Sequence, residues 1–208
     1  DEIERKDVRI GDTVVIQKAG DVIPEVVEVL SNLRPALSKT FIFPKNCPLC
    51  DFRLVRPDNE AVHRCPNLNC PGRRRESFLH FVSRKAFNID GLGEKIVEQL
   101  LQSGLIHDVA DLFAFTKEDL EPLERFAEKS AQNLVGAIAA ARMQSLHRFL
   151  YALGIRHVGE ETAIDLAKHF GTIERVQRAT REELETVAEI GPVMTESILA
   201  WFADKDNQ

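Results

Sequence analysis

Four cysteines are the residues of this chain whose types and spacing point most directly to chemistry. Cys47 and Cys50 are separated by two residues and Cys65 and Cys70 by four, with 14 residues between the two pairs. Two short knuckles joined by a loop are typical of four-cysteine zinc sites. Because all four ligands come from the protein, no coordination position is left for a substrate. The sequence therefore predicts a structural, non-catalytic zinc ion bound by these four thiolates.

Three alternatives to this site remain open on the sequence. Two disulfides are one, although disulfides are uncommon in the cytosol and no export signal is visible. A thioredoxin-like redox pair at Cys47 and Cys50 is another, but no βαβ pattern surrounds the motif. His63 could also serve as a ligand, at the expense of one cysteine of a complete set. We prefer the four-thiolate site.

The segment before the cysteines has the pattern of a β-hairpin. Residues 13–17 and 22–30 are rich in β-branched side chains, and the Gly20-Asp21 pair between them is a turn signal. Two strands alone are marginally stable in water, so we expect them to belong to a larger barrel or sheet. Pro24 implies an edge strand or a bulge. The strand pattern begins almost at the start of the chain.

From Glu76 onward, helical periodicity continues to the end of the chain, and it repeats. Aliphatic or aromatic residues recur at steps of 34, 32 and 32 residues, each followed by a small residue. Aliphatic residues also recur four positions before and seven positions after that small residue. Such periods are found in arrays of helix pairs. The central residues of the four repeats are Leu92, Phe126, Val158 and Ile190.

Hairpins that bind a phosphate are distinguished from those of a purely structural array by a glycine on one or both sides of the central residue. Glycine permits a positive φ and removes the side chain, so backbone N–H groups at the start of the next helix are uncovered. Such a helix start favours a phosphate. The second repeat, Arg125-Phe126-Ala127, lacks both glycines, and we expect it to be structural. The candidate DNA contacts are Gly91, Gly93, Lys95, Arg156, His157, Gly159 and Gly191.

Charge is distributed unevenly along the chain. The net charge of −6 argues at first against a nucleic-acid partner, because phosphate binding is driven largely by cations. Residues 39–85, however, carry 10 basic and 4 acidic groups, whereas residues 86–208 carry 12 and 21. A hairpin that donates backbone amides needs little net positive charge. We add Arg73, Arg74 and Arg75 as candidate phosphate contacts; a solvated helix start is the alternative.

These observations predict a mainly α protein in three parts. Residues 1–38 carry strands of a larger barrel or sheet, 39–75 form a four-cysteine zinc finger, and 76–208 form a domain of four tandem helix-hairpin-helix motifs. No apolar run approaches the length of a membrane span, and the N-terminus does not resemble a signal peptide. We therefore expect a cytoplasmic protein without a membrane partner.

The β-hairpin segment Gly11–Pro24, the four cysteines and the four helical hairpins, in this order, resemble bacterial NAD-dependent DNA ligase. The resemblance implies that residues 1–38 are the final strands of that family's OB domain. The segments His80–Ala86 and Arg148–Arg156 are similar to that family's sequence as well. The resemblance implies an enzyme that seals nicks in duplex DNA, in which a lysine takes AMP from NAD and passes it to the 5′-phosphate. It also implies two partners, nicked double-stranded DNA and the remaining domains of the same ligase.

The family's adenylated lysine lies in a Lys-x-Asp-Gly motif, which in this chain has no counterpart. The nearest segment is Asn88-Ile89-Asp90-Gly91, with asparagine in place of the lysine. We therefore assign no catalytic residue and expect NAD to bind outside this chain. We also expect the fragment to be inactive alone and to lack the family's C-terminal BRCT domain. His107, His147 and His169 have no evident catalytic partner.

Two other functions compete with a ligase fragment. The first is a free-standing helix-hairpin-helix adaptor of repair or recombination, against which the incomplete strand pair argues. The second is a helical protein-binding array without a DNA role, which salt-dependent binding to nicked duplex would exclude.

Overall fold

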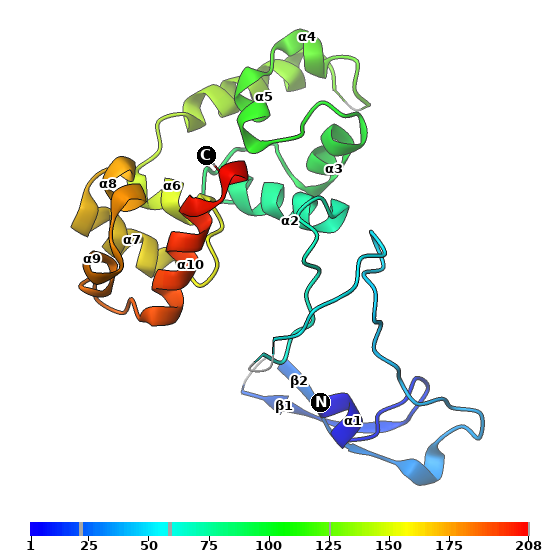
Figure 1. The fold of residues 1–208 in the computed structure, drawn as a ribbon. Helices are drawn as coiled ribbons and strands as arrows, with labels where there is room; N and C mark the ends of the chain where they lie inside the picture. Colours follow the sequence, from blue (N-terminus) through cyan, green and yellow to red (C-terminus); the bar gives the residue numbers. More distant parts are fainter. Residues whose placement is uncertain (21–22, 58–59, 125, 208) are drawn as a thin grey trace. The chain divides into compact units, whose positions relative to one another are not determined.

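A computed structural model describes residues 1–20, 23–57, 60–124 and 126–207 of the chain. These residues form two compact units, Asp1–Cys70 and Pro71–Gln208, which are described separately below. Figure 1 shows strands in the first unit and a set of helices in the second. Among the described residues, no helix combines the length and the apolar character needed to cross a bilayer.

The N-terminal unit contains the predicted hairpin. Strands β1 (Val14–Ala19) and β2 (Ile23–Val29) pair antiparallel, with an irregularity in the register between Val15 and Ile16. The hairpin prediction is confirmed, although Asp21 and Val22 lie outside the described residues. Helix α1 (Glu2–Arg5) comes first, and a 3-10 turn, η1 (Ser31–Leu33), follows β2.

An ion-pair network fastens the segment before β1 to the segment after β2. Arg34 donates from Nε to Asp12 Oδ1 and from a terminal nitrogen to Asp12 Oδ2, both at 2.9 Å, and it also reaches Asp7 Oδ2 at 2.6 Å. The Asp12 side chain is only 1% exposed. The backbone N–H of Arg9 donates to the same carboxylate. The hydrogen bond from Arg34 holds the pKa of Asp12 below its ordinary value.

This network predicts acid sensitivity of the N-terminal unit. A carboxyl group with a lowered folded-state pKa adds stability above its unfolded pKa of about 3.9, and this stability is lost as the pH falls through the folded value. The protection factors of the amides in β1 and β2, which correct for the intrinsic pH dependence of exchange, should therefore fall below about pH 4. In Asp12→Asn they should already be low at neutral pH. Glu28→Gln, a change at an exposed carboxylate of β2, is the control; equal exchange in both variants would contradict the prediction.

The helical unit begins at Pro71, five residues before the helical periodicity expected from the sequence. Proline suits the first helical position because its missing N–H would have no partner there. The principal helices are α2 (Pro71–Val82), α3 (Glu94–Gln102), α4 (Lys117–Leu120), α5 (Glu128–Ala141), α6 (Leu146–Ala152), α7 (Glu160–Phe170), α8 (Ile173–Arg178), α9 (Arg181–Glu185) and α10 (Pro192–Ala203). Two 3-10 turns, η2 (Val109–Ala114) and η3 (Lys205–Asn207), complete the unit.

Two hydrophobic cores organise these helices. The first joins α2, α3, η2, α4 and α5, and the second joins α7 to α10. Helix α6 contributes to both, with Ala152 in the first core and Leu150 in the second, and Figure 1 shows it between the two groups. The aromatic side chains predicted to pack in cores do so: Phe78, Phe81, Phe113, Phe115, Phe149, Phe170 and Trp201.

Polar contacts also fasten α6 to the segment that follows α2. The Arg148 guanidinium donates to two carbonyl oxygens, Ala86 O at 2.7 Å from Nε and Arg84 O from a terminal nitrogen. The ring nitrogen Nε2 of His80 lies 2.7 Å from Tyr151 O. Because these bonds span more than 60 residues, they fix the third hairpin against the end of α2.

Candidate metal centre and nucleic-acid interface

The four cysteine sulfur atoms meet at one point. All four Sγ atoms lie within 4.8 Å of one another, with Cys47 and Cys70 at 3.8 Å and Cys50 and Cys65 at 3.5 Å. With a Zn–S bond of about 2.3 Å, a tetrahedral site has sulfur–sulfur edges of about 3.8 Å. The cysteines are free thiols, so the disulfide alternative is not realised. The donor set fits a four-coordinate zinc ion.

Tight backbone turns aim the sulfur atoms at this point. After Cys47 the chain reverses: Asp51 N–H donates to Cys47 O at 2.9 Å and Cys47 N–H donates to Phe52 O at 2.8 Å. Asp51 itself adopts a left-handed φ of 56°. On the other side, Cys70 N–H donates to Asn67 O at 3.1 Å. Each cysteine pair is thus carried on its own short turn, as the spacing predicts.

The thiols of this cluster conflict electrostatically when no cation is bound. The backbone N–H of Phe52 lowers the pKa of Cys50 to about 6. Desolvation raises the pKa of its neighbour Cys65 to about 12. Like charges this close cannot all form in a confined space, so only some of the thiols would ionise. A dication removes the conflict, because it stabilises all four thiolates together.

Two of the four cysteines are also the most buried residues in the described part of their unit. Among the described residues of Asp1–Cys70, only Cys47 and Cys70 are buried, while apolar side chains such as Leu49, Phe52 and Val62 are exposed. The finger therefore lacks an apolar core of its own. His63 does not join the cluster; its ring stacks on Phe43 with centroids 4.2 Å apart. The alternative in which His63 is a ligand is wrong.

The four hairpins share one turn geometry. In each, the N–H of the central residue donates to the carbonyl three positions earlier, at 3.0–3.3 Å. In each, the residue after the central one caps the next helix and its carbonyl accepts an N–H four positions later, at 3.0 Å. The central side chains Leu92, Val158 and Ile190 are buried and Phe126 packs against the first core, which confirms that this position anchors the hairpin.

The glycines of these turns act differently from the sequence prediction. Left-handed φ values occur at the residue before the central one: 88° at Gly91, 67° at His157 and 62° at Glu189. Gly159 and Gly191, after the central residue, have φ values of −87° and −96°, which any residue can adopt. The positive-φ explanation is therefore right for Gly91 and wrong for the helix-capping glycines, and two turns are left-handed without glycine.

The capping glycines leave open space beside the start of the next helix. A methyl group built at Gly93, Gly159 or Gly191 would meet no heavy atom within 4 Å, and no side chain caps the following helix. The second hairpin differs. Ala127 occupies the same position with the same extended backbone, and its N–H donates to Ser130 Oγ at 2.8 Å. This amide is already satisfied within the protein, while Arg125 lies outside the described residues.

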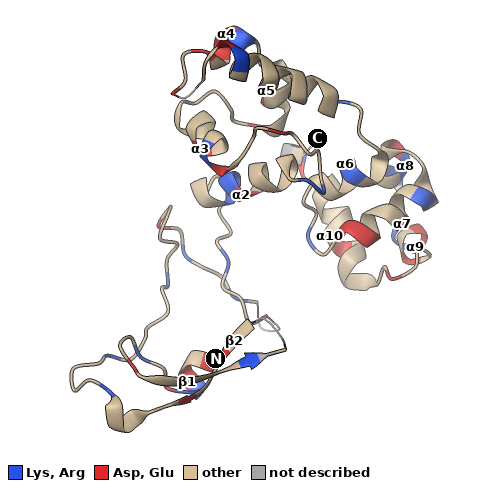
Figure 2. Ribbon diagram, turned by 180° about the vertical axis from the view of Figure 1, so that it is seen from behind, with Lys and Arg blue, Asp and Glu red and all other residues tan. Residues whose placement is uncertain are grey.

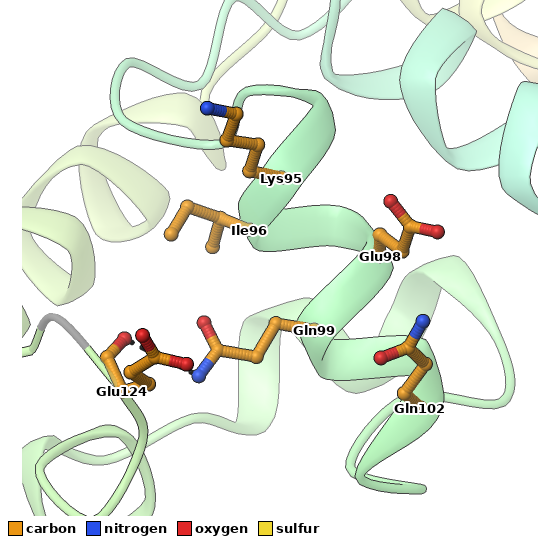
Figure 3. A pocket seen from close by; sticks show the side chains of 6 residues that line it. All are labelled: Lys95, Ile96, Glu98, Gln99, Gln102 and Glu124. Atoms are coloured by element: carbon orange, nitrogen blue, oxygen red, sulfur yellow. Dashed lines mark hydrogen bonds between the residues drawn. The ribbon is translucent and has the colours of Figure 1, made fainter.

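The predicted basic contacts lie near the open turns. Lys95 and Arg156 are exposed. Figure 3 shows Lys95 at one end of a cleft of about 600 Å³, while Gln99 donates to Glu124 O at 3.2 Å farther along α3. His157 Nδ1 lies 3.0 Å from Ser197 Oγ in α10. This hydrogen bond links the third hairpin turn to the fourth hairpin.

The three arginines at the start of α2 stand at the positive end of a helix dipole, which is unfavourable for cations. The helix has no acidic residue in its first turn. Arg74 donates to His107 O at 3.0 Å, and Arg75 pairs with Glu76 and Glu94. Of the three, Arg73 is the most exposed, and Arg74 and Arg75 are half-buried. Figure 2 shows acidic and basic positions interspersed along the helical unit. Any DNA contact is therefore local to a few side chains and turns.

Sequence reasoning missed the polar side chains that complete these turns. Ser130 and Ser197 belong to no motif, and only the three-dimensional packing brings Ser197 to the third hairpin. The position of Ser130, three residues after a helix cap, was the one available signal, because capping residues often lie at that spacing.

Known families match this chain in four segments. The NAD-dependent DNA ligase OB-fold domain matches residues 1–38, and the NAD-dependent DNA ligase C4 zinc finger domain matches residues 46–71. A SAM-like helix-hairpin-helix tandem matches residues 84–140, and a helix-hairpin-helix motif matches residues 148–208.

A C4 zinc finger followed by tandem helix-hairpin-helix turns defines a zinc- and DNA-binding protein. Its OB-fold and zinc-finger segments both match domains specific to one enzyme family, in the order predicted from the sequence. These two segments, residues 1–38 and 46–71, are domains of the NAD-dependent DNA ligase family.

Proposed function

We propose that this chain is the duplex-DNA-binding portion of a nick-sealing, NAD-dependent DNA ligase. One observation carries the proposal: three hairpin turns with open, uncapped helix starts recur in a chain that also carries the ligase-type OB and zinc-finger segments. The two ligase-specific segments favour this function over a free-standing repair adaptor. A cytoplasmic location is part of the same proposal.

In this proposal the first, third and fourth hairpins hold the phosphate backbone. A methyl group built at Gly93, Gly159 or Gly191 would meet no heavy atom within 4 Å, so a phosphate oxygen can approach the backbone of these helix starts closely. Backbone contacts of this kind position a protein on duplex DNA without reading its sequence. The contacts are Gly91 and Gly93 with Lys95, Arg156 and His157 with Gly159, and Gly191, with Arg73, Arg74 and Arg75 at the start of α2.

The four cysteines hold a structural zinc ion in this proposal. Every ligand is a protein thiolate, so the ion has no open position from which to activate water or a phosphate. Cys47, Cys50, Cys65 and Cys70 therefore stabilise a fold and take no part in the chemistry of sealing.

The adenylating lysine and the NAD site belong to another part of the parent enzyme. The four-residue segment closest to the family's Lys-x-Asp-Gly motif starts with Asn88, and its Gly91 forms the left-handed position of the first hairpin turn. An asparagine amide cannot form the lysine–AMP bond. These 208 residues alone should therefore form no enzyme–AMP adduct with NAD and should seal no nick.

Salt-dependent binding to duplex DNA tests the proposal. The chain should bind a nicked duplex oligonucleotide, and log Kd should rise linearly with log salt. With the five basic side chains of this proposal neutralising phosphates, a fourfold rise in salt should weaken binding by about 500-fold. Fluorescence anisotropy with nicked and intact duplexes of one sequence measures both the salt slope and any preference for the nick. No binding at low salt would favour a protein-binding array and would overturn the proposal.

A further inference from the structure

An ion pair recurs at the start of the second helix in three of the four hairpins. The first helical residue is glutamate in the first three repeats and Pro192 in the fourth. Each glutamate pairs with a basic side chain from another segment, and the residues of these pairs are Glu94 with Arg75, Glu128 with Lys117, and Glu160 with Lys85. A basic side chain is thus held beside each of these helix starts.

The pair at the third hairpin spans the greatest distance along the sequence. Lys85 Nζ lies 2.7 Å from Glu160 Oε2, although 75 residues separate the two. The Lys85 side chain is 64% exposed, so its ammonium group is accessible to a ligand. Glu160 directly follows Gly159, the uncapped glycine of this turn. Glu160 therefore holds the ammonium group of Lys85 on the residue next to the open turn.

The backbone around Lys85 is fixed by the third hairpin itself. The carbonyl groups on both sides of Lys85, those of Arg84 and Ala86, accept hydrogen bonds from Arg148. Arg148 belongs to α6, the helix that leads into the third turn. Two contacts from this hairpin, one from each of its helices, therefore place Lys85: Arg148 holds its backbone and Glu160 its ammonium group.

This arrangement resolves a conflict at the third turn. Glutamates at positions 160 and 161 suit a helix N-terminus, but they repel a phosphate that approaches the same amides. Lys85 neutralises the charge of Glu160 by forming an ion pair with it. Its hydrogen bond with Glu160 raises the pKa of Lys85 above its ordinary value, so the group stays charged at neutral pH. A flexible ammonium group can transfer from a carboxylate to a phosphate with little movement.

We propose that Lys85 is a phosphate-binding residue of the third hairpin, and that Arg148 and Glu160 position it there. The ligand is a phosphodiester of the DNA backbone. The inference rests on the proposed DNA-binding function and adds a contact supplied from outside the hairpin motif.

The Lys85→Met variant tests the contact. Removing one phosphate contact should lower affinity for nicked duplex by about eightfold at about 0.1 M salt and reduce the log–log salt slope by about 0.9. Lys85→Arg should retain both. The matched control is Lys168→Met in the same helical unit, where Lys168 pairs with Asp165 within α7. It removes the same charge away from the turn and should leave affinity and slope unchanged.

The Arg148→Lys variant tests the positioning. The change keeps the charge, but a single ammonium group cannot reproduce the forked contact to two carbonyls. Affinity should fall although the net charge is unchanged. Adding Lys85→Met to this variant should cause less loss than the product of the two single effects, because both act on one contact. A fully multiplicative loss would overturn the positioning role. Thermal melting of each variant establishes that the helical unit is folded.

Two outcomes separate this inference from the proposed function. If Lys85→Met binds as tightly as the original chain while blocking the Gly159 turn weakens binding, Lys85 is not a contact and this inference alone fails. If neither change affects binding, the hairpins are not the DNA-binding surface and the proposed function fails with it.

Discussion

A chain with threonine in place of both Gly159 and Gly191 should lose DNA affinity while remaining folded. Threonine is β-branched, so its side chain would occupy the open space over each turn, and its hydroxyl would accept a hydrogen bond from the amides that we assign to phosphate. Hydrogen bonds to a charged group contribute about 1.5–3 kcal/mol, so each hairpin lost should weaken binding by at least about tenfold.

Threonine is chosen because the fold should tolerate it. Both positions have extended φ and ψ values and no neighbour within 4 Å of an added methyl group. As a helix cap, threonine is about as favourable as glycine, whereas valine is much less so. The free energy of unfolding, measured with urea, should therefore change by less than about 1 kcal/mol.

The second hairpin supplies the matched control. Ala127→Thr introduces the same side chain at the same turn position, but there the amide already donates to Ser130. Its DNA affinity should equal that of the original chain. Undiminished affinity in the double glycine variant, or an equal loss in Ala127→Thr, would show that the open turns are not the contacts.

Removal of zinc should unfold the finger and leave the helices intact. Among the described residues, the buried hydrophobic residues of Asp1–Cys70 are two of the metal ligands, Cys47 and Cys70, so no apolar core remains when the metal is lost. Metal binding contributes about 10–16 kcal/mol in small zinc-finger peptides, far more than the few backbone bonds of this finger can replace. Helices α2 to α10 have two cores of their own and should persist.

Hydrogen exchange with and without a chelator measures this effect region by region. The amides of Cys47, Val55 and Arg64, which form backbone bonds of 2.8–2.9 Å, should lose their protection. Those of α5 and α7 should keep theirs, and the far-ultraviolet circular dichroism should retain most of its helical signal. Unchanged protection of the finger after zinc loss is verified by metal analysis would contradict a structural role.

The features predictable from the sequence are those with local signals. Cysteine spacing predicts the sulfur cluster because each pair needs only a short turn to aim two thiols at one point. The repeat predicts the hairpins because one buried residue, such as Val158, anchors each of them at a constant period. The strand pair follows from β-branched residues on both sides of a turn.

The features that sequence reasoning missed depend on contacts between distant residues. Arg34 and Asp12, or Lys85 and Glu160, have no fixed spacing, and an exposed charge has the same appearance in sequence whether or not it has a partner. Helix α1 was missed because it has only four residues and therefore no periodicity. The conformation of His157 was missed for a different reason: left-handed backbone is expected at glycine, and here it occurs at an exposed histidine.

The second hairpin shows that shape and binding are separate properties of this motif. It lacks both glycines, yet it retains the turn hydrogen bond and the capping conformation of the other three. A tandem array of such units can therefore gain or lose phosphate-binding turns one at a time, while the helical scaffold that spaces the turns stays the same. The affinity of the array and its architecture are then free to evolve independently.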